Sequence, residues 1–345
     1  MDIRNLFEIE LPIVQAPMAG AQAGALAAAV CEAGGLGSLP CALLTPEGMT
    51  KELDLIRART RRPVNVNFFC HVNPPPDAER ETAWRAALEP YYREFGVDPA
   101  SIGSGPGRAP FSAESADALE RYRPEVVSFH FGLPSAELVA RVRSWGSHVI
   151  ASATTVQEAL WLESRGVAAI IAQGVEAGGH RGMFLTEDLT TQVGTLSLVP
   201  QIVAAVKVPV IAAGGIADAR GVKAALALGA AGVQVGTAYL LCPEATITPT
   251  HRAALKSADA RHTALTNVFT GRPSRCIVNR IVREKGPINP AAPRFPLAGG
   301  AIAPLRAKAE AQGSADFSPI WSGQNASGCR EVPAAELTRG LAAGI

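Results

Sequence analysis

The sequence lacks the features that mark membrane, secreted and metal-binding proteins. No run of apolar residues approaches the roughly 18 that a transmembrane helix requires. The first residues, MDIRNLFEIELPIV, lack the basic and apolar segments of a signal peptide. The six cysteines are scattered, with no CxxC pair and no cysteine–histidine cluster at the spacing of a metal site. These absences predict a cytoplasmic protein with reduced thiols, no metal and no membrane association.

Charge of either sign is also scarce, and the two signs balance. The chain has 32 Lys and Arg against 31 Asp and Glu, a formal charge of +1, and no basic stripe of the kind that binds phosphate backbones. We therefore expect no nucleic acid partner. A hydrophobic content of 48% excludes a disordered chain, and a length of 345 residues suits one α/β barrel with additional segments.

Short apolar, β-rich runs alternate with Ala- and Leu-rich helical patterns as far as about residue 240. Eight such runs are present: Ile13–Met18, Leu36–Pro40, Pro63–Phe69, Glu125–Gly132, His148–Thr154, Ala168–Gly174, Pro209–Ile216 and Gly232–Leu240. Eight strands with crossover helices predict an α/β protein with a closed TIM (β/α)8 barrel. An open doubly wound sheet is the alternative, but it would normally carry a GxGxxG turn where this chain reads QAPMAGAQAG.

Two segments fall outside this repeat. Residues 71–124 are polar, contain NPPP and GSGPGRAP, and hold one clear helical pattern around Ala78–Phe95. They predict an enlarged loop insertion above the barrel mouth. From residue 243 the chain is helical in patches and then rich in Pro and Gly. We therefore predict a barrel over residues 1–242 and a C-terminal helical and irregular extension over residues 243–345 that covers the mouth.

Glycine-rich stretches follow the last two predicted strands, AAGGIAD at Ala212–Asp218 and QVGTAY at Gln234–Tyr239. The carboxyl ends of all barrel strands meet at one face, where glycines let backbone N–H groups approach an anion closely. The pair predicts a phosphate cradle, although these glycines equally permit tight turns. Asn67 and Gln173 end apolar strands, and their amides suit the edge of a flat heteroaromatic ring such as isoalloxazine. The alternative is that both amides satisfy local backbone groups.

The turn after the sixth run reads VEAGGHRG and contains His180. An imidazole titrates near neutral pH, so it suits a general base for an acidic C–H bond or, when protonated, a partner for an anionic substrate. The glycines leave room for substrate and cofactor, so we predict that His180 is catalytic or binds substrate. His130, in SFHFG, and Arg181 are further candidates for substrate binding, with the barrel rim and the surface as alternative roles. Glu176 is expected to cap or orient the turn.

These motifs together resemble the nitronate monooxygenase family, formerly called 2-nitropropane dioxygenases, and in particular its class I branch. The shared stretches cover nearly the whole chain and include VQAPMAG, VNVNFF, AQGVEAGGHRGMF, VPVIAAGGIADARGVKAALALGAAGVQVGTAYLLCPEA and the late IWSGQ. The resemblance implies a TIM barrel with non-covalent FMN at the strand ends and His180 as the catalytic base. By motif position, it implies FMN contacts at Ala16, Pro17, Met18, Asn67, Gln173, Gly178, Gly215, Gln234, Val235, Gly236 and Thr237.

The implied reaction is oxidation of alkyl nitronates, the conjugate bases of nitroalkanes, by dioxygen to carbonyl compounds and nitrite. Propionate 3-nitronate is the substrate type that the resemblance implies, with neutral nitroalkanes as further substrates. The expected partners are these small molecules and dioxygen, and the protein is expected to be a monomer or a homodimer. Two alternatives stay open. One is an FMN-dependent NAD(P)H enoyl-acyl-carrier-protein or quinone reductase, and the other is a flavin-binding protein without turnover.

Overall fold

The structure is a computed structural model that describes residues 2–103 and 107–345. Eight parallel strands follow the order β1-β9-β8-β6-β5-β4-β3-β2 around a barrel. Two hydrogen bonds of 2.9 Å, from Gln15 N to Leu36 O and from Leu36 N to Ile13 O, join the first strand to the second and complete the ring. The strands are β1 (Ile13–Gln15), β2 (Gly37–Pro40), β3 (Val64–Phe69), β4 (Val126–His130), β5 (His148–Ala153), β6 (Ala169–Gln173), β8 (Val210–Ala213) and β9 (Gly232–Val235).

This arrangement confirms the predicted TIM barrel and excludes the open doubly wound sheet. Each of the eight apolar runs contains one barrel strand, although the strands are shorter than the runs. The difference is largest after Val235, and the runs also continue beyond Gln15 and Ala213, where the chain leaves the ladder to form the turns above the barrel. The polar and glycine residues at the ends of the runs therefore lie in these turns.

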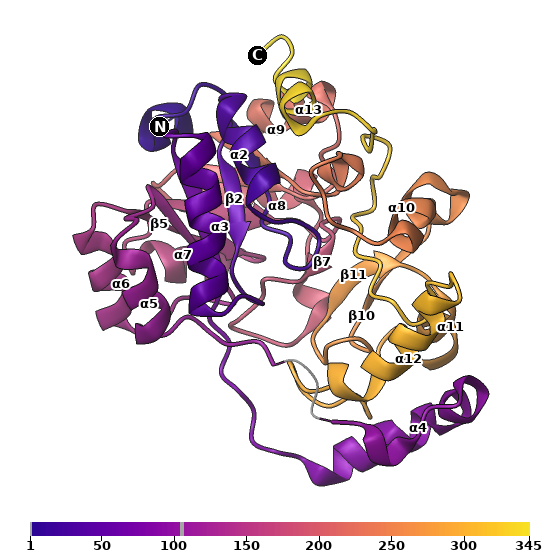
Figure 1. Ribbon diagram of the computed structural model, residues 1–345. Coiled ribbons are helices and arrows are strands. Elements are labelled where there is room, and N and C mark those ends of the chain that lie inside the picture. The colour runs from indigo at the N-terminus through magenta and orange to yellow at the C-terminus, as the bar shows by residue number, and fades with distance from the viewer. Residues whose placement is uncertain (1, 104–106) are drawn as a thin grey trace.

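Eight helices surround the barrel. They are α2 (Gly24–Glu32), α3 (Pro46–Arg59), α5 (Ala113–Glu120), α6 (Ala136–Ser144), α7 (Val156–Glu163), α8 (Thr195–Ala205), α9 (Ala219–Ala227) and α13 (Ala334–Leu341). Five of them begin where a side-chain oxygen accepts a hydrogen bond from the backbone N–H three residues later, the usual N-cap: Thr45, Ser112, Ser135, Thr155 and Asp218. The last helix of the chain, α13, packs between α2 and α9 and so closes the ring (Figure 1).

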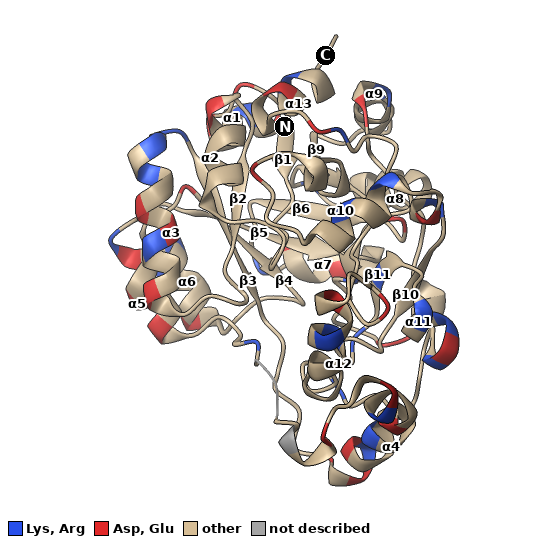
Figure 2. Cartoon of the chain, turned by 45° about the vertical axis from the view of Figure 1, so that its right-hand side comes forward, with Lys and Arg blue, Asp and Glu red and all other residues tan. Residues whose placement is uncertain are grey.

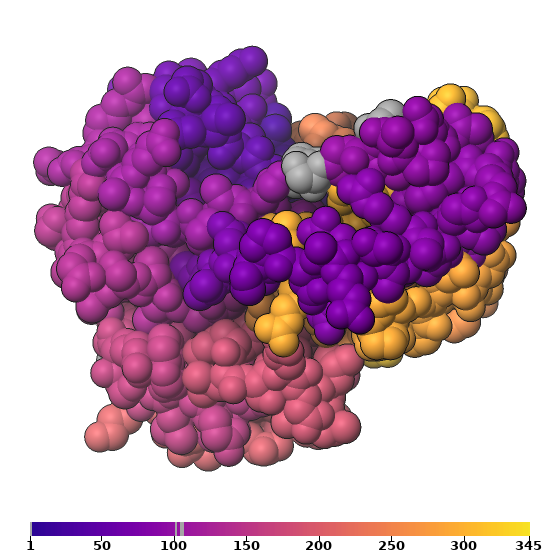
Figure 3. Space-filling view, turned by 90° about the horizontal axis from the view of Figure 1, so that it is seen from below, coloured from indigo at the N-terminus to yellow at the C-terminus, as the bar shows by residue number. Residues whose placement is uncertain are grey.

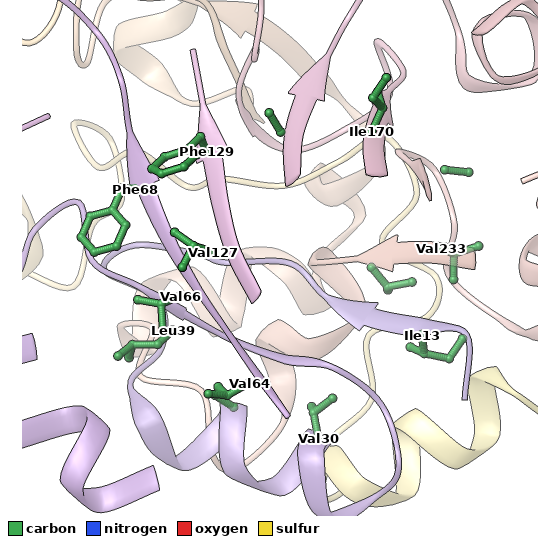
Figure 4. Packing of buried hydrophobic residues seen from close by; sticks show 14 of the residues in the cluster. Ile13, Val30, Leu39, Val64, Val66, Phe68, Val127, Phe129, Ile170 and Val233 are labelled. Atoms are coloured by element: carbon green, nitrogen blue, oxygen red, sulfur yellow. The ribbon is translucent and has the colours of Figure 1, made fainter. Parts of the chain in front are cut away.

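Successive residues of each strand point to opposite faces, which divides the core into two layers. Outward-facing side chains such as Val66, Val127 and Phe129 pack against the helices (Figure 4). Inward-facing side chains at the amino-terminal ends of the strands are apolar. The short helix α1 (Ile3–Phe7) closes that end and packs Ile3 and Phe7 into the interior. A ligand can therefore enter only from the opposite end, where the strands finish.

Most of the remaining elements lie beside the barrel mouth. They are α4 (Ala78–Phe95), the 3-10 turn Pro99–Ser101, α10 (Pro249–Lys256), β10 (Thr263–Thr266), β11 (Ser274–Ile277), α11 (Arg280–Lys285) and α12 (Gly299–Ala311). The bounds of α4 confirm the helix predicted from the sequence. The predicted insertion over residues 71–124 also includes residues 104–106, which lie outside the described residues.

Helix α4 and the C-terminal segment share one hydrophobic cluster, although about 200 positions separate them in the sequence. Trp84 Nε1 donates to Ala298 O over 3.3 Å, and Tyr92 OH donates to Ala301 O over 2.7 Å. Figure 3 shows the α4 segment lying across the C-terminal part of the chain. The insertion after β3 is therefore held by the extension that follows β9.

Charged residues lie mainly on the outer helices and on α4 and α11, whereas the barrel strands carry few (Figure 2). Within residues 2–103 and 107–345, no helix combines the length and the apolar character needed to cross a bilayer.

Candidate active site

A cavity lies at the carboxyl ends of the barrel strands and gathers most of the predicted site residues. Those that line it are Ala16, Pro17, Met18, Asn67, His130, Gln173, Gly178, His180, Gly215, Gln234, Gly236 and Thr237. They come from six strands or the turns that follow them. The convergence follows from the parallel direction of the strands, which brings all their carboxyl ends to the same face.

Two predicted site residues do not line the cavity. The side chain of Val235 points outward into the helix layer because it alternates with Gln234 and Gly236, which line the cavity. Arg181 is wholly buried, and its guanidinium donates to the backbone oxygens of Gln173 and Gly174, each over 2.7 Å. The prediction that Arg181 binds substrate is therefore corrected: this side chain fixes the end of β6.

The backbone at His180 is held by the C-terminal extension. Gly179–His180 forms the short strand β7, which pairs antiparallel with β11 so that His180 lies opposite Ser274. Arg181 N also donates to Pro273 O over 2.9 Å. The side chain of His180 therefore enters the cavity from a turn that the barrel and the extension fix together.

Aromatic side chains surround the His180 imidazole. The ring centroids of Phe69, Phe131, Phe295 and Trp321 lie 5.8, 6.0, 5.3 and 5.5 Å from that of His180. Burial among these groups lowers the pKa of His180 well below its usual value, and the positive charge of Arg108 lowers it further. His180 is therefore neutral at neutral pH. Its Nε2 lies 3.0 Å from Thr270 Oγ1, and Nδ1 has no hydrogen-bond partner among the described residues.

His130 lines the cavity beside His180, but both of its ring nitrogens are engaged. Nδ1 lies 3.1 Å from Ser152 Oγ, and Nε2 lies 3.1 Å from His180 O. Burial lowers the pKa of His130 to about 3, so this ring is also neutral. Its contacts make His130 a support for the His180 backbone.

The side-chain amides of Gln173 and Asn67 differ in which of their polar atoms lack a hydrogen-bond partner. Gln173 donates from Nε2 to His180 O over 3.0 Å and accepts at Oε1 from Gly182 N over 2.8 Å, so it holds the turn that carries His180. Asn67 donates to Ser128 O and Oγ through Nδ2, and its Oδ1 has no partner among the described residues. Of these two amides, Asn67 is therefore the one that offers a free oxygen to a ligand.

The glycine turns after β8 and β9 have the properties of an anion site. Gly215 has a φ of +72°, a conformation that favours glycine. Gly236 precedes the 3-10 turn Thr237–Leu241, and neither its N–H nor that of Gly215 donates to another described residue. Two free N–H groups at adjacent turns suit a phosphate. Beside them, Glu176 accepts from Thr195 N and Oγ1 over 2.7 to 3.0 Å, which confirms its expected role in orienting the turn.

An unpaired amide oxygen in the cavity suits a flavin. Gln234 Oε1 is buried without a hydrogen-bond partner among the described residues, which is costly unless a ligand donor satisfies it. With Asn67 Oδ1 and the free N–H groups of Gly215 and Gly236, the cavity offers both free acceptors and free N–H donors. A flavin mononucleotide requires this combination, so the residues present fit the group.

The extension completes the cavity. Gly323 N donates to Thr237 Oγ1 over 2.9 Å, and Asn325 Nδ2 donates to Gly215 O over 3.0 Å. Trp321, Ser322, Gly323 and Asn325 all line the cavity. The WSGQ motif was visible in the sequence, but nothing in its local pattern indicated that it lies over the phosphate turns.

Sequence reasoning also missed Arg108 and Thr270. Arg108 lies in the loop between α4 and α5 and lines the cavity, and Thr270 contacts the proposed base. Thr270 belongs to the stretch FTGRPSR, to which the sequence alone assigned no role. A polar residue in an irregular loop gives no periodic signal, so neither position was identifiable before the fold was known.

Comparisons with known proteins agree with this geometry. The sequence model of the nitronate monooxygenase family matches residues 2–344. A nitronate monooxygenase from Pseudomonas aeruginosa is 43% identical and covers 98% of this chain and 97% of its own length. The solved structure of a nitroalkane oxidase from Streptomyces ansochromogenes is 40% identical, with a TM-score of 0.89 and coverage of 99% and 96%. FabK from Thermotoga maritima is 26% identical, with a TM-score of 0.70 and coverage of 98% and 94%.

Proposed function

The chain belongs to the nitronate monooxygenase family of flavin-dependent enzymes, and from this premise we propose that it uses FMN to oxidise alkyl nitronates with dioxygen. The products are carbonyl compounds and nitrite. The observation that carries the proposal is the neutral imidazole of His180, whose Nδ1 is free in a cavity walled by aromatic rings. A neutral ring with a free lone pair is the form that accepts a proton.

FMN would lie along the strand ends, with its phosphate at the glycine turns. The phosphate would accept hydrogen bonds from the backbone at Gly215, Gly236 and Thr237, and the ring would meet Asn67 and Gln234. Further contacts are proposed at Ala16, Pro17, Met18, Gln173, Gly178 and the backbone of Val235. When bound, FMN supplies the redox chemistry by accepting an electron from the nitronate. Every residue in this set except Val235 lines the cavity.

The residues of this chain accept the proton and exclude water. For a neutral nitroalkane, His180 Nδ1 accepts the proton from the α-carbon, and the aromatic side chains exclude water from the anion that forms. For a nitronate that is already ionised, no base is needed. Because the lowered pKa keeps His180 neutral, this imidazole does not supply a positive charge for such an anion.

The test is an assay without a nicotinamide. The purified protein should release FMN on denaturation. It should form nitrite and consume oxygen with a panel of nitronates in the absence of NAD(P)H. A protein that forms no nitrite with any member of the panel would contradict the proposal and favour a flavin-binding role without turnover.

The competing function is an NAD(P)H-dependent enoyl-acyl-carrier-protein or quinone reductase. The likeness to FabK favours it, but at 26% identity against 43% for the nitronate monooxygenase. Anaerobic mixing with NAD(P)H separates the two. A monooxygenase of this family should keep its yellow flavin, whereas rapid bleaching identifies a reductase.

A further inference from the structure

Arg108 presents an unsatisfied cation to the cavity. Its guanidinium makes no hydrogen bond or ion pair with another described residue, and its contact is with the ring of Phe295, whose centroid lies 5.6 Å from Cζ. The side chain is only partly exposed. A guanidinium carries five N–H donors, and its partial burial is costly when none of them is paired.

The other arginines near the site do not line the cavity, and each donates to at least one protein oxygen, although Nε of Arg272 has no partner among the described residues. Arg181 donates to backbone oxygens below the cavity, and Arg272 donates to Met183 O. Arg275 donates to Val175 O over 2.9 Å and to Thr263 Oγ1 over 3.1 Å. No Asp or Glu is among the described residues that line the cavity. Arg108 is therefore the cavity-lining cation whose donors are available to a ligand.

The position of Arg108 is at the His180 end of the cavity. Phe295 contacts both residues, since its ring lies 5.3 Å from that of His180, and the backbone oxygen of Arg108 lies 3.0 Å from His71 Nε2. The free N–H groups that suit the FMN phosphate are on the turns after β8 and β9. An anionic group held by Arg108 would therefore belong to the substrate and not to the FMN phosphate.

We propose that Arg108 binds a carboxylate at the far end of the substrate and makes the enzyme selective for nitronates with this second anionic group. A guanidinium and a carboxylate form two parallel hydrogen bonds, which also orient the substrate chain. The nitronate carbon is then directed toward His180 and the flavin. This inference rests on the proposed function for its substrate and adds a specificity-determining residue to it.

Two substrates of equal length test the proposal. Propionate 3-nitronate carries the carboxylate, and the nitronate of 1-nitropropane ends in a methyl group. Arg108→Gln should raise the KM for propionate 3-nitronate roughly ten- to a hundredfold, the factor that a charge-assisted hydrogen-bond pair contributes, with kcat largely kept. The KM for the nitronate of 1-nitropropane should change less than twofold. Arg108→Lys, which keeps the charge without the planar fork, should recover part of the loss.

A second arginine variant is the control. Arg220→Gln, at an exposed surface position, should leave both KM values unchanged. Flavin content and circular dichroism establish that each variant is folded. Equal effects of Arg108→Gln on the two substrates, or no effect on either, would overturn the proposal.

A binding measurement separates this inference from the proposed function. Succinate, an unreactive dicarboxylate, should perturb the absorption spectrum of the bound flavin, and Arg108→Gln should weaken its Kd by at least tenfold. If wild-type protein oxidises no nitronate but binds succinate through Arg108, the carboxylate subsite stands and the proposed reaction fails. If nitronates are oxidised and succinate binding is the same in Arg108→Gln, the reaction stands and the subsite is wrong.

Discussion

The Nε2 atom of His180 lies 3.0 Å from the hydroxyl oxygen of Thr270. That hydroxyl also lies 3.4 Å from the backbone oxygen of Arg272, which can only accept a hydrogen bond. Both contacts are satisfied together when Thr270 donates to Arg272 O and accepts from His180 Nε2–H. The proton of the neutral imidazole then lies on Nε2, and the free lone pair is on Nδ1, which has no partner among the described residues.

Thr270 is therefore expected to act as a positioning residue. Thr270→Val leaves Nε2–H without a partner in a buried place, which should lower kcat on nitroethane about tenfold or more because the tautomer and the ring orientation are no longer fixed. KM and the rates on ethylnitronate should change little. Steady-state kinetics on both substrates provide the measurement, and Thr270→Ser, which keeps the hydroxyl, is the matched control. A Ser variant as impaired as the Val variant would contradict this role.

Removal of the imidazole should separate the two substrate forms. His180→Asn is expected to retain yellow FMN but to lower kcat/KM on neutral nitroethane by roughly 10²- to 10⁴-fold, the contribution of a general base. The rate on ethylnitronate should fall less than tenfold, because no proton has to be removed from it. Nitrite release with the two substrates at equal concentration gives the comparison, and wild-type rates on nitroethane would show that His180 is not the base.

Closure of the cavity by the extension depends on Gly178. A Cβ at this position would lie 2.5 Å from Gly323 N and 2.6 Å from the carbonyl carbon of Ser322, so Gly178→Ala must displace this segment. The displacement breaks the hydrogen bond from Gly323 N to Thr237 Oγ1. We expect the Kd for FMN to rise about tenfold or more, measured by fluorescence quenching of the free flavin.

The matched control for this change is Gly103→Ala. No described residue other than its chain neighbours lies within 4 Å of a Cβ at that position, and its φ requires no left-handed conformation. The control should bind FMN as tightly as the wild type. Unchanged FMN affinity in Gly178→Ala would mean that Ser322 and Gly323 are not part of the flavin site.

Acid should destabilise the folded protein before the carboxylates titrate. Burial lowers the pKa of His130 to about 3 and that of His251 to about 4. The unfolded chain binds protons at these histidines below about pH 6.5, whereas the native state does not. Stability is therefore complete above pH 6.5 and falls as the pH decreases toward 4, by about 1.4 kcal/mol per pH unit for each such histidine.

Urea unfolding at pH 7.5, 6 and 5 with saturating FMN measures this slope. His251→Gln should reduce the fall in the free energy of unfolding by the contribution of one histidine. The variant should keep its packing, since the Nε2 contact of His251 with Trp321 O at 3.0 Å is within reach of a glutamine amide. The exposed His262→Gln should leave the slope unchanged. Equal slopes in wild type and His251→Gln would show that His251 takes up its proton while folded.

Much of the site could be predicted because it depends on periodicity that is local in the sequence. The eight apolar runs and the helix Ala78–Phe95 follow from hydrophobic spacing and helix signals over fewer than 20 residues. Parallel strands then bring Asn67, His180 and Gly215 to one face whatever their separation in the chain. Strand alternation also determines that the side chain of Val235 points away from the cavity. The prediction took Gln234 to Thr237 as one motif and did not apply this alternation.

The sequence by itself thus determined the barrel, the face that carries the cavity and the position of His180 at that face, because these depend on the order and spacing of neighbouring residues. The tertiary structure alone decided which nitrogen of His180 is free, that Arg181 is occupied below the cavity, and that Arg108 is the available cation. These outcomes depend on loops packed against residues far away in the chain, such as Thr270 against His180. Such contacts arise from the packing of the whole molecule, and no local pattern encodes them.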